Sequence, residues 1–185
     1  MLMLGVTSLM DVIVDDSKVS LREHLRETAT LARSWALFER MSAVDIEVFE
    51  TAALLHDVGK RHVPEDILYF PGPLDEEMFS VVQEHVRLGA SIIQEYVSAR
   101  IVRIVFQHHE RMDGAGYPSG IAGHNIEPLA RRLAIVDAYV AMLESRPYQA
   151  VRTKGQVCAE IIRCAGSQFD FMLATDFVKY VERYV

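Results

Sequence analysis

The chain has 185 residues, half of them hydrophobic, and a formal net charge of −7 at pH 7. This length suits one domain with a single core, and the apolar content excludes a disordered chain. The acidic balance argues against a surface for a nucleic-acid polymer, which needs clustered lysine and arginine. A small phosphate substrate is not excluded, because bound dications would reverse the local field.

The apolar start of the chain, residues 1–14, has no basic region before it and no clear cleavage site, and polar residues follow at 15–18. Neither a signal peptide nor a membrane-spanning helix fits this pattern. Cys158 and Cys164 match neither a zinc knuckle nor a redox pair, and we interpret them as helix core residues in a reducing compartment. We therefore expect a cytoplasmic protein with no membrane partner.

The expected organisation is an N-terminal segment, residues 1–19, packed on one domain, residues 20–185. The apolar segment is alternatively an interface, for example in a homodimer. Apolar residues at helical spacing predict that the domain is all-α.

The first helix is expected over 19–41, with one face formed by His24, Thr28, Leu31 and Trp35. Ser42 is expected to cap the next helix, which ends near Gly59 and carries His56 and Asp57 in its last turn. A third helix is expected to begin at the acidic residues 75–77.

His85 then falls in the middle of that third helix, and the pair His108-His109 ends a helix over 97–109. The glycine-rich segment 113–123 cannot be helical, and a loop of this length in a compact domain is usually functional. A helix from Pro128 carries Asp137, and two more follow, with expected caps at Thr153 and Thr175.

Histidines and aspartates on these helices form the most informative pattern of the chain. Imidazole and carboxylate groups suit Fe, Mn or Zn, and this set is larger than one ion needs. Each histidine alone is more often an ordinary core or surface residue, but burying all of them unpaired is costly, and metal coordination resolves the whole set. The candidate metal ligands are His24, His56, Asp57, His85, His108, His109 and Asp137.

Neighbouring residues on a helix diverge by about 100°. The pairs His56-Asp57 and His108-His109 can therefore converge only at helix ends, which is where the pattern places them. The carboxylate of Asp57 has two oxygens and is the natural bridge between two ions.

These residues belong to an ordered series of motifs that resembles the HD-GYP domain, a branch of the HD superfamily of metal-dependent phosphohydrolases. The resemblance implies a compact HD-domain helical bundle of about seven helices with a long Gly-Tyr-Pro loop. The series consists of His56-Asp57-Val58-Gly59-Lys60, Pro71-Gly72-Pro73-Leu74, His85, His108-His109-Glu110, Asp113-Gly114-Ala115-Gly116-Tyr117-Pro118, Asp137 and Arg146-Pro147-Tyr148.

The activity that the resemblance implies is a phosphodiesterase that hydrolyses cyclic di-GMP to linear pGpG, and in some relatives to GMP, by a metal-bridging hydroxide. Two divalent ions are implied, with iron expected and manganese as the alternative. One ion would be held by His24, His56, Asp57 and Asp137; Asp57 would bridge to a second held by His85, His108 and His109.

Substrate contacts are also implied by the resemblance. Lys60 is expected to contact the scissile phosphate, and Arg146 to anchor the substrate with help from Arg22, although solvated basic residues would look the same. Glu110 and Asp113 are expected to orient His108 or His109 rather than to bind metal. His62 and His124 are interpreted as surface residues.

The chain departs from the family pattern at a few positions. Ser20 stands where some relatives have a glutamate that holds a third ion, so a two-metal site is expected. Val140 and Gln149 replace a usual aspartate and a usual basic residue. These changes keep two alternatives open: a hydrolase of another cyclic dinucleotide or nucleotide, and a catalytically decayed nucleotide-sensing interaction domain. A partner of the diguanylate-cyclase type, bound through the 113–123 loop, is a further implication.

Overall fold

The computed structural model describes residues 19–144 and 152–185, and its regular structure in these ranges is helical. The all-α prediction is therefore confirmed. The expected packing of residues 1–18 and the expected contact of Arg146 lie outside the described residues. None of the described helices combines the length and the apolar character that crossing a bilayer requires.

The helices, in chain order, are α2 (Val19–Phe38), α3 (Ala43–Leu55), α4 (Glu65–Leu68), α5 (Glu76–Gln83), α6 (His85–Ile93), α7 (Ala99–Gln107), α8 (Pro128–Leu143), α9 (Lys154–Arg163) and α10 (Phe171–Tyr184). Two short 3₁₀ turns join them, η1 (Val58–His62) and η2 (Gly123–Asn125).

Polar side chains fix where several helices begin. The predicted caps Ser42 and Thr153 accept hydrogen bonds from backbone N–H groups in the first turns of α3 and α9, and Asp75 caps α5 in the same way. The predicted cap Thr175 is wrong, because Asp170 caps α10 and Thr175 lies inside that helix, where its hydroxyl bonds to a backbone carbonyl. Satisfying an N-terminal N–H in this way typically contributes about 1 kcal/mol.

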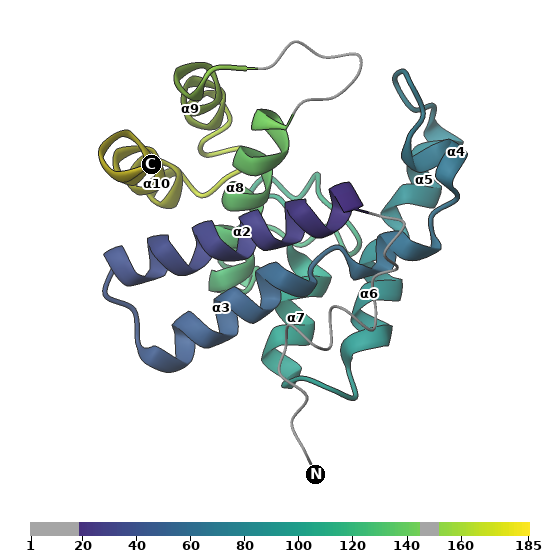
Figure 1. Cartoon of the computed structure of the whole chain (residues 1–185), viewed down its shortest axis with the longest axis horizontal. Coiled ribbons are helices and arrows are strands. Elements are labelled where there is room, and N and C mark those ends of the chain that lie inside the picture. The colour runs from purple at the N-terminus through teal and green to yellow at the C-terminus, as the bar shows by residue number, and fades with distance from the viewer. Residues whose placement is uncertain (1–18, 145–151) are drawn as a thin grey trace.

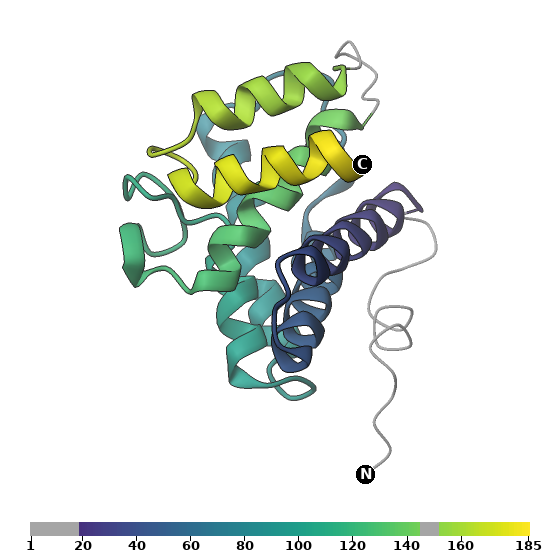
Figure 2. The same ribbon diagram turned by 90° about the vertical axis from the view of Figure 1, so that its left-hand side faces the viewer.

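Helices α2 and α3 form an antiparallel pair, and α8 packs behind it. Helices α9 and α10 lie together beyond α8 (Figures 1 and 2). The rings of Trp35, Phe49 and Phe177 join three of these helices, with the centroids of Trp35 and Phe177 4.9 Å apart. All three side chains are fully buried, and each such burial stabilises the fold by roughly 1.5–3 kcal/mol. Phe177 also packs on Tyr139 of α8, with the ring centroids 5.3 Å apart. This core therefore joins α2 and α8, which carry His24 and Asp137, to α3, which ends beside His56.

Two predicted helix boundaries are wrong, and both lie near the candidate site. The helix expected to end near Gly59 ends at Leu55, and residues 58–62 form the tighter turn η1. The helix expected to contain His85 in its middle is divided, so that His85 begins α6.

The backbone of η1 contacts the backbone of α6 closely at Gly59. A Cβ atom added to Gly59 would overlap the carbonyl oxygen of His85 and lie 2.7 Å from the nitrogen of Gly89. Only glycine lets η1 approach α6 so closely.

Candidate metal centre

The structure brings the seven candidate ligands together from five parts of the chain. Asp57 lies with His24 and His56 in one group and with His85, His108 and His109 in another, and within each group the nearest ligand atoms lie within 4.8 Å of one another. Asp137, from α8, joins the first group: its Oδ1 lies 3.0 Å from Nε2 of His24 and 3.4 Å from Nε2 of His56.

Asp57 lies between the two groups of histidines. Its Oδ2 is 3.8 Å from Nε2 of His24 and 3.4 Å from Nε2 of His56. Its Oδ1 is 3.1 Å from Nε2 of His85 and 3.8 Å from Nε2 of His108. Each oxygen of one carboxylate thus faces a different set of imidazoles, as a bridge between two cations requires.

Three histidine rings are oriented by backbone carbonyls that lie close by in the sequence. Nδ1 of His56, His85 and His108 lies 2.6–2.7 Å from the carbonyl oxygen of the residue three positions earlier. A carbonyl oxygen only accepts hydrogen bonds, so each Nδ1 carries the proton and donates it. The lone pair of Nε2 is then free and points into the cluster, which is the arrangement found in metal-ligating histidines.

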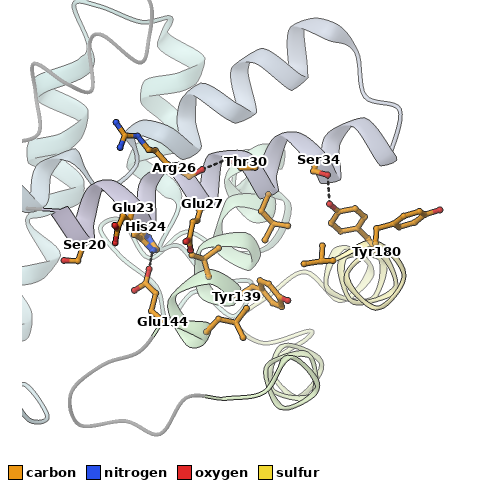
Figure 3. A pocket seen from close by; sticks show the side chains of 15 residues that line it. Ser20, Glu23, His24, Arg26, Glu27, Thr30, Ser34, Tyr139, Glu144 and Tyr180 are labelled. Carbon is orange, nitrogen blue, oxygen red and sulfur yellow. Dashed lines mark hydrogen bonds and ion pairs between the residues drawn. The ribbon is translucent and has the colours of Figure 1, made fainter.

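The ring of His24 is oriented differently. Its Nδ1 lies 2.6 Å from Oε1 of Glu144, at the end of α8 (Figure 3). The sequence analysis did not single out Glu144. A signal was present, however, because Glu144 follows Asp137 by seven residues and so lies on the same face of the helix two turns later.

Burial and missing hydrogen bonds test whether these residues fit a metal pair. His24, His56, Asp57, His85 and His108 are all buried. Among the described residues, Nε2 of His85, Nε2 of His108 and Oδ1 of Asp57 are buried and find no hydrogen-bond partner. An unsatisfied buried polar group costs about 1–3 kcal/mol. Cations bound between these atoms would satisfy all three, so the residues fit the implied ions.

The protonation of the histidines is shaped by burial. Burial lowers the pKa of His108 and lowers that of His109 well below its usual value. Neutral imidazole is the form that binds metal. Burial also lowers the pKa of His24, but hydrogen bonds to Asp137 and Glu144 outweigh it and raise the pKa to about 10.

Both aspartates of the cluster stay ionised. Burial would raise the pKa of Asp57, but the charges of Lys60 and His56 hold it well below the usual value. Burial opposes ionisation of Asp137 too, and its hydrogen bonds with His24 and His56 lower its pKa well below the usual value. The centre therefore offers anionic oxygens beside the neutral nitrogens of His108 and His109.

Of the residues predicted to contact substrate, Lys60 and Arg22 lie in the described ranges. Lys60, in η1, pairs with Oδ2 of Asp57 through its ammonium group, and its side chain is about a quarter exposed. Arg22 lies on α2 two residues before His24 and is partly buried. His62 and His124, predicted as surface residues, are exposed.

A cavity of about 330 Å³ opens onto the centre at His108, His109 and Asp137. The loop after α7 forms one of its walls. The ring centroid of Tyr117 lies 4.8 Å from that of His109, and its backbone N–H donates to the carbonyl oxygen of His109. A Cβ atom on Gly116 would come within 2.5 Å of that same oxygen, so the loop can fold this tightly only with glycine there.

Glu110 and Asp113 hold this loop rather than a histidine. The buried carboxylate of Glu110 accepts hydrogen bonds from the N–H groups of Ser119 and Ile121, at 2.7 and 3.1 Å. Asp113 pairs with Arg111 and accepts from the N–H of Ala115. Since Nδ1 of His108 already donates to a helix carbonyl, the expected orientation of His108 by either acid is wrong.

Comparison with known proteins agrees with this geometry. A family model described as HD domain matches residues 8–173. The cyclic di-GMP phosphodiesterase PA4108 of Pseudomonas aeruginosa is 39% identical over 168 residues, which cover 87% of this chain and 40% of that protein. The 3′3′-cGAMP-specific phosphodiesterase 1 of Vibrio cholerae is 30% identical over 155 residues, covering 83% of this chain and 36% of that protein.

Among solved structures, Bd1817, a HDG"Y"P protein from Bdellovibrio bacteriovorus, superposes with a TM-score of 0.73 at 18% identity and covers 96% of this chain and 56% of its own. This match shows a shared fold. The chain spans less than half the length of the two phosphodiesterases named above. The chain belongs to the HD-domain family, and its motif series is that of the HD-GYP branch.

Proposed function

We propose that this domain is a binuclear metal-dependent phosphodiesterase that hydrolyses cyclic di-GMP to linear pGpG, with GMP as a further product. The observation that supports this most directly is the placement of Asp57, whose two oxygens face two separate groups of histidines. The activity named for the Pseudomonas aeruginosa relative supports the choice of substrate.

In this proposal the first ion is held by His24, His56, Asp57 and Asp137, and the second by Asp57, His85, His108 and His109. Two dications in such sites supply an activated water nucleophile near neutral pH and neutralise charge on the phosphate. Imidazole and carboxylate ligands are compatible with iron and manganese, and iron is proposed on the family resemblance, with manganese as the alternative.

The protein's own groups would bind and orient the substrate. The ammonium group of Lys60 lies beside Asp57, so it can stabilise negative charge that develops on the phosphoryl oxygens. The rings of Phe79 and Tyr117 line the 330 Å³ cavity next to the centre. Aromatic rings bind nucleobases by stacking, at roughly 1–3 kcal/mol per base. Arg146 and Arg22 complete the proposed phosphate contacts.

The wider setting of the domain is proposed on the resemblance alone. It comprises a cytoplasmic location, a partner of the diguanylate-cyclase type bound through the 113–123 loop, and a homodimer as one form of assembly. Asp113, Ala115, Ser119 and Gly120 are exposed, so part of the loop is accessible to a partner.

Another cyclic dinucleotide is the second candidate substrate. The observation that favours it is the Vibrio cholerae relative, which is named for 3′3′-cGAMP and is 30% identical to this chain. Val140 and Gln149, where the usual acidic and basic residues are replaced, are consistent with a changed preference.

The test is product analysis by chromatography after anaerobically purified protein, loaded with Fe(II) or Mn(II), is incubated with cyclic di-GMP, 3′3′-cGAMP or cyclic di-AMP. We expect pGpG from cyclic di-GMP, and none from an Asp57→Ala variant. His62→Ala is the matched control, since His62 is an exposed histidine on η1. Turnover of 3′3′-cGAMP alone would favour the second candidate, and no turnover with two ions bound would favour a binding domain.

A further inference from the structure

Within the metal centre, the four histidines whose Nδ1 contacts are described fall into two kinds. His56, His85 and His108 donate to backbone carbonyl oxygens of the residues three positions earlier in the chain. His24 donates instead to the carboxylate of Glu144, which lies 120 positions along the chain. The first kind of contact is local in the sequence, whereas the second exists only when α2 and α8 are packed together.

The charge on this acceptor changes what His24 can do as a ligand. A carboxylate on one ring nitrogen fixes the tautomer and makes the opposite nitrogen more basic than a carbonyl acceptor does. Hydrogen bonds to an ionised acceptor are also shorter and about twice as strong as neutral ones. Glu144 therefore both aims Nε2 of His24 and strengthens it as a donor to a cation.

Helix α8 holds the ring of His24 from both sides. Oδ1 of Asp137 lies 3.0 Å from Nε2, and Oε1 of Glu144 lies 2.6 Å from Nδ1. Seven residues separate these two acids, so they lie on one face of α8 two turns apart. Asp137 belongs to the cluster itself, whereas Glu144 lies outside it and reaches the ions only through His24.

Glu144 can be changed without disturbing the core. Its side chain is 31% exposed and lines a groove of about 920 Å³ between α2 and α8 (Figure 3). The same groove is lined by Glu23 and Glu27, which are exposed on α2. This provides a matched acid in the same surroundings for comparison.

We propose that Glu144 is a positioning residue that sets the affinity of one ion of the pair, the ion held by His24, His56, Asp57 and Asp137, and leaves the other ion unaffected. The proposal rests on the two-ion site proposed above. It makes the two ions inequivalent, because His24 is a ligand of only one of them and its ring is held by a side chain from a distant helix.

The experiment measures Mn(II) binding to the whole chain by competition with a chelator, with no substrate present. In Glu144→Ala we expect one of the two ions to bind roughly 10–100-fold more weakly and the other to be unchanged. Glu144→Gln keeps an oxygen acceptor without the charge, and we expect an intermediate loss. Glu27→Gln removes a charge from the same groove and should change neither affinity.

A double-variant cycle separates positioning from a general structural effect. His24→Ala should weaken the same ion, and adding Glu144→Ala to it should cause no further loss. Thermal unfolding of each metal-free variant checks that the fold is retained. Equal weakening of both ions, an equal effect of Glu27→Gln, additive losses in the double variant, or a wild-type chain that binds fewer than two ions would each overturn the proposal.

The proposed function and this inference can fail separately. A wild-type chain that binds two ions and hydrolyses no dinucleotide contradicts the function alone. A chain that hydrolyses cyclic di-GMP while Glu144→Ala keeps both affinities contradicts the inference alone.

Discussion

The metal centre and the loop beside it, residues 110–123, are held in place by different kinds of contact. In the centre, three histidine rings donate to backbone carbonyl oxygens only three residues earlier in the chain. In the loop, the backbone is held by the side chain of Glu110. The N–H of Met112 also donates to the carbonyl of Gln168, and the N–H of Asp113 to that of Ser167.

This difference separates contacts between residues close in the sequence from contacts that depend on the tertiary fold. A ligand oriented by a nearby backbone carbonyl is placed as soon as that part of the chain folds and packs. A loop held by residues far along the chain takes its shape only in the finished fold. We therefore expect changes at the centre to affect stability and metal binding, and changes in the loop to affect substrate binding with the metals retained.

The largest effect is expected from Gly59→Ala, which tests the backbone contact beneath the centre. The added Cβ would overlap the carbonyl oxygen of His85, and backbone on both sides leaves little room to shift. We expect a loss of at least roughly 4 kcal/mol in the free energy of unfolding, measured with urea. Gly155→Ala is the control: its Cβ meets nothing within 4 Å, so it should be neutral or stabilising by about 0.5–1 kcal/mol.

Lys60→Met tests whether the centre's chemistry depends on the ammonium group beside Asp57. If Lys60 stabilises the transition state, kcat should fall by about 10²–10³, the loss typical of removing one such group. Metal content, measured by elemental analysis, should stay at the wild-type value. Lys179→Met, at an exposed position on α10, should leave kcat unchanged. Loss of metal in Lys60→Met would assign that lysine a role in the ligand set instead.

Glu110→Ala removes the acceptor that holds the loop. It leaves the N–H groups of Ser119 and Ile121 without their partner, at a cost of about 1–3 kcal/mol. Hydrogen exchange of residues 113–121 should accelerate, and both metal affinities should persist. The exposed ion pair of Asp113 with Arg111 provides the control, since Asp113→Asn should cost no more than about 1 kcal/mol. Metal loss in Glu110→Ala would contradict the separation between loop and centre.

The sequence predicted the helices, and it singled out the seven side chains that the structure brings together, because helix spacing and residue type are read locally. Ser42 and Thr153 cap helices as predicted, since the contact lies within three residues. The pairs His56-Asp57 and His108-His109 lie at helix ends, where neighbouring side chains can converge.

Tertiary contacts account for what was missed. The division of the helix at Glu84 coincides with the packing of Gly59 on α6, and no proline or glycine marks that break in the sequence. Glu110 was assigned to a histidine because the residues that it binds are nine and eleven positions away, in a loop whose path the sequence does not specify. Glu144 resembles an ordinary solvated acid at a helix end until α2 and α8 are packed together.

The smallest effect is the pH dependence of the metal-free protein, measured with a chelator present. Burial lowers the pKa of His108 and His109, so both stay neutral when folded and take up protons on unfolding below about 6.5. Their contribution to the free energy of unfolding is fully present above that pH. It is lost as the pH falls, by up to about 1.4 kcal/mol per pH unit for each histidine. His24 behaves in the opposite way: its pKa is raised to about 10, so its contribution is lost only between about 6.5 and 10.

Between pH 6.5 and 5 the contribution of the centre to the free energy of unfolding should therefore fall, while that of the loop should not. Arg111 and the N–H of Ala115 lower the pKa of Asp113 to about 2, so the ion pair in the loop persists in this range. His109→Gln should reduce the slope of stability against pH, and His62→Gln, at an exposed position, should not. A flat profile from pH 6.5 to 5 would mean that these imidazoles are already charged in the folded protein, which a site made to receive cations does not allow.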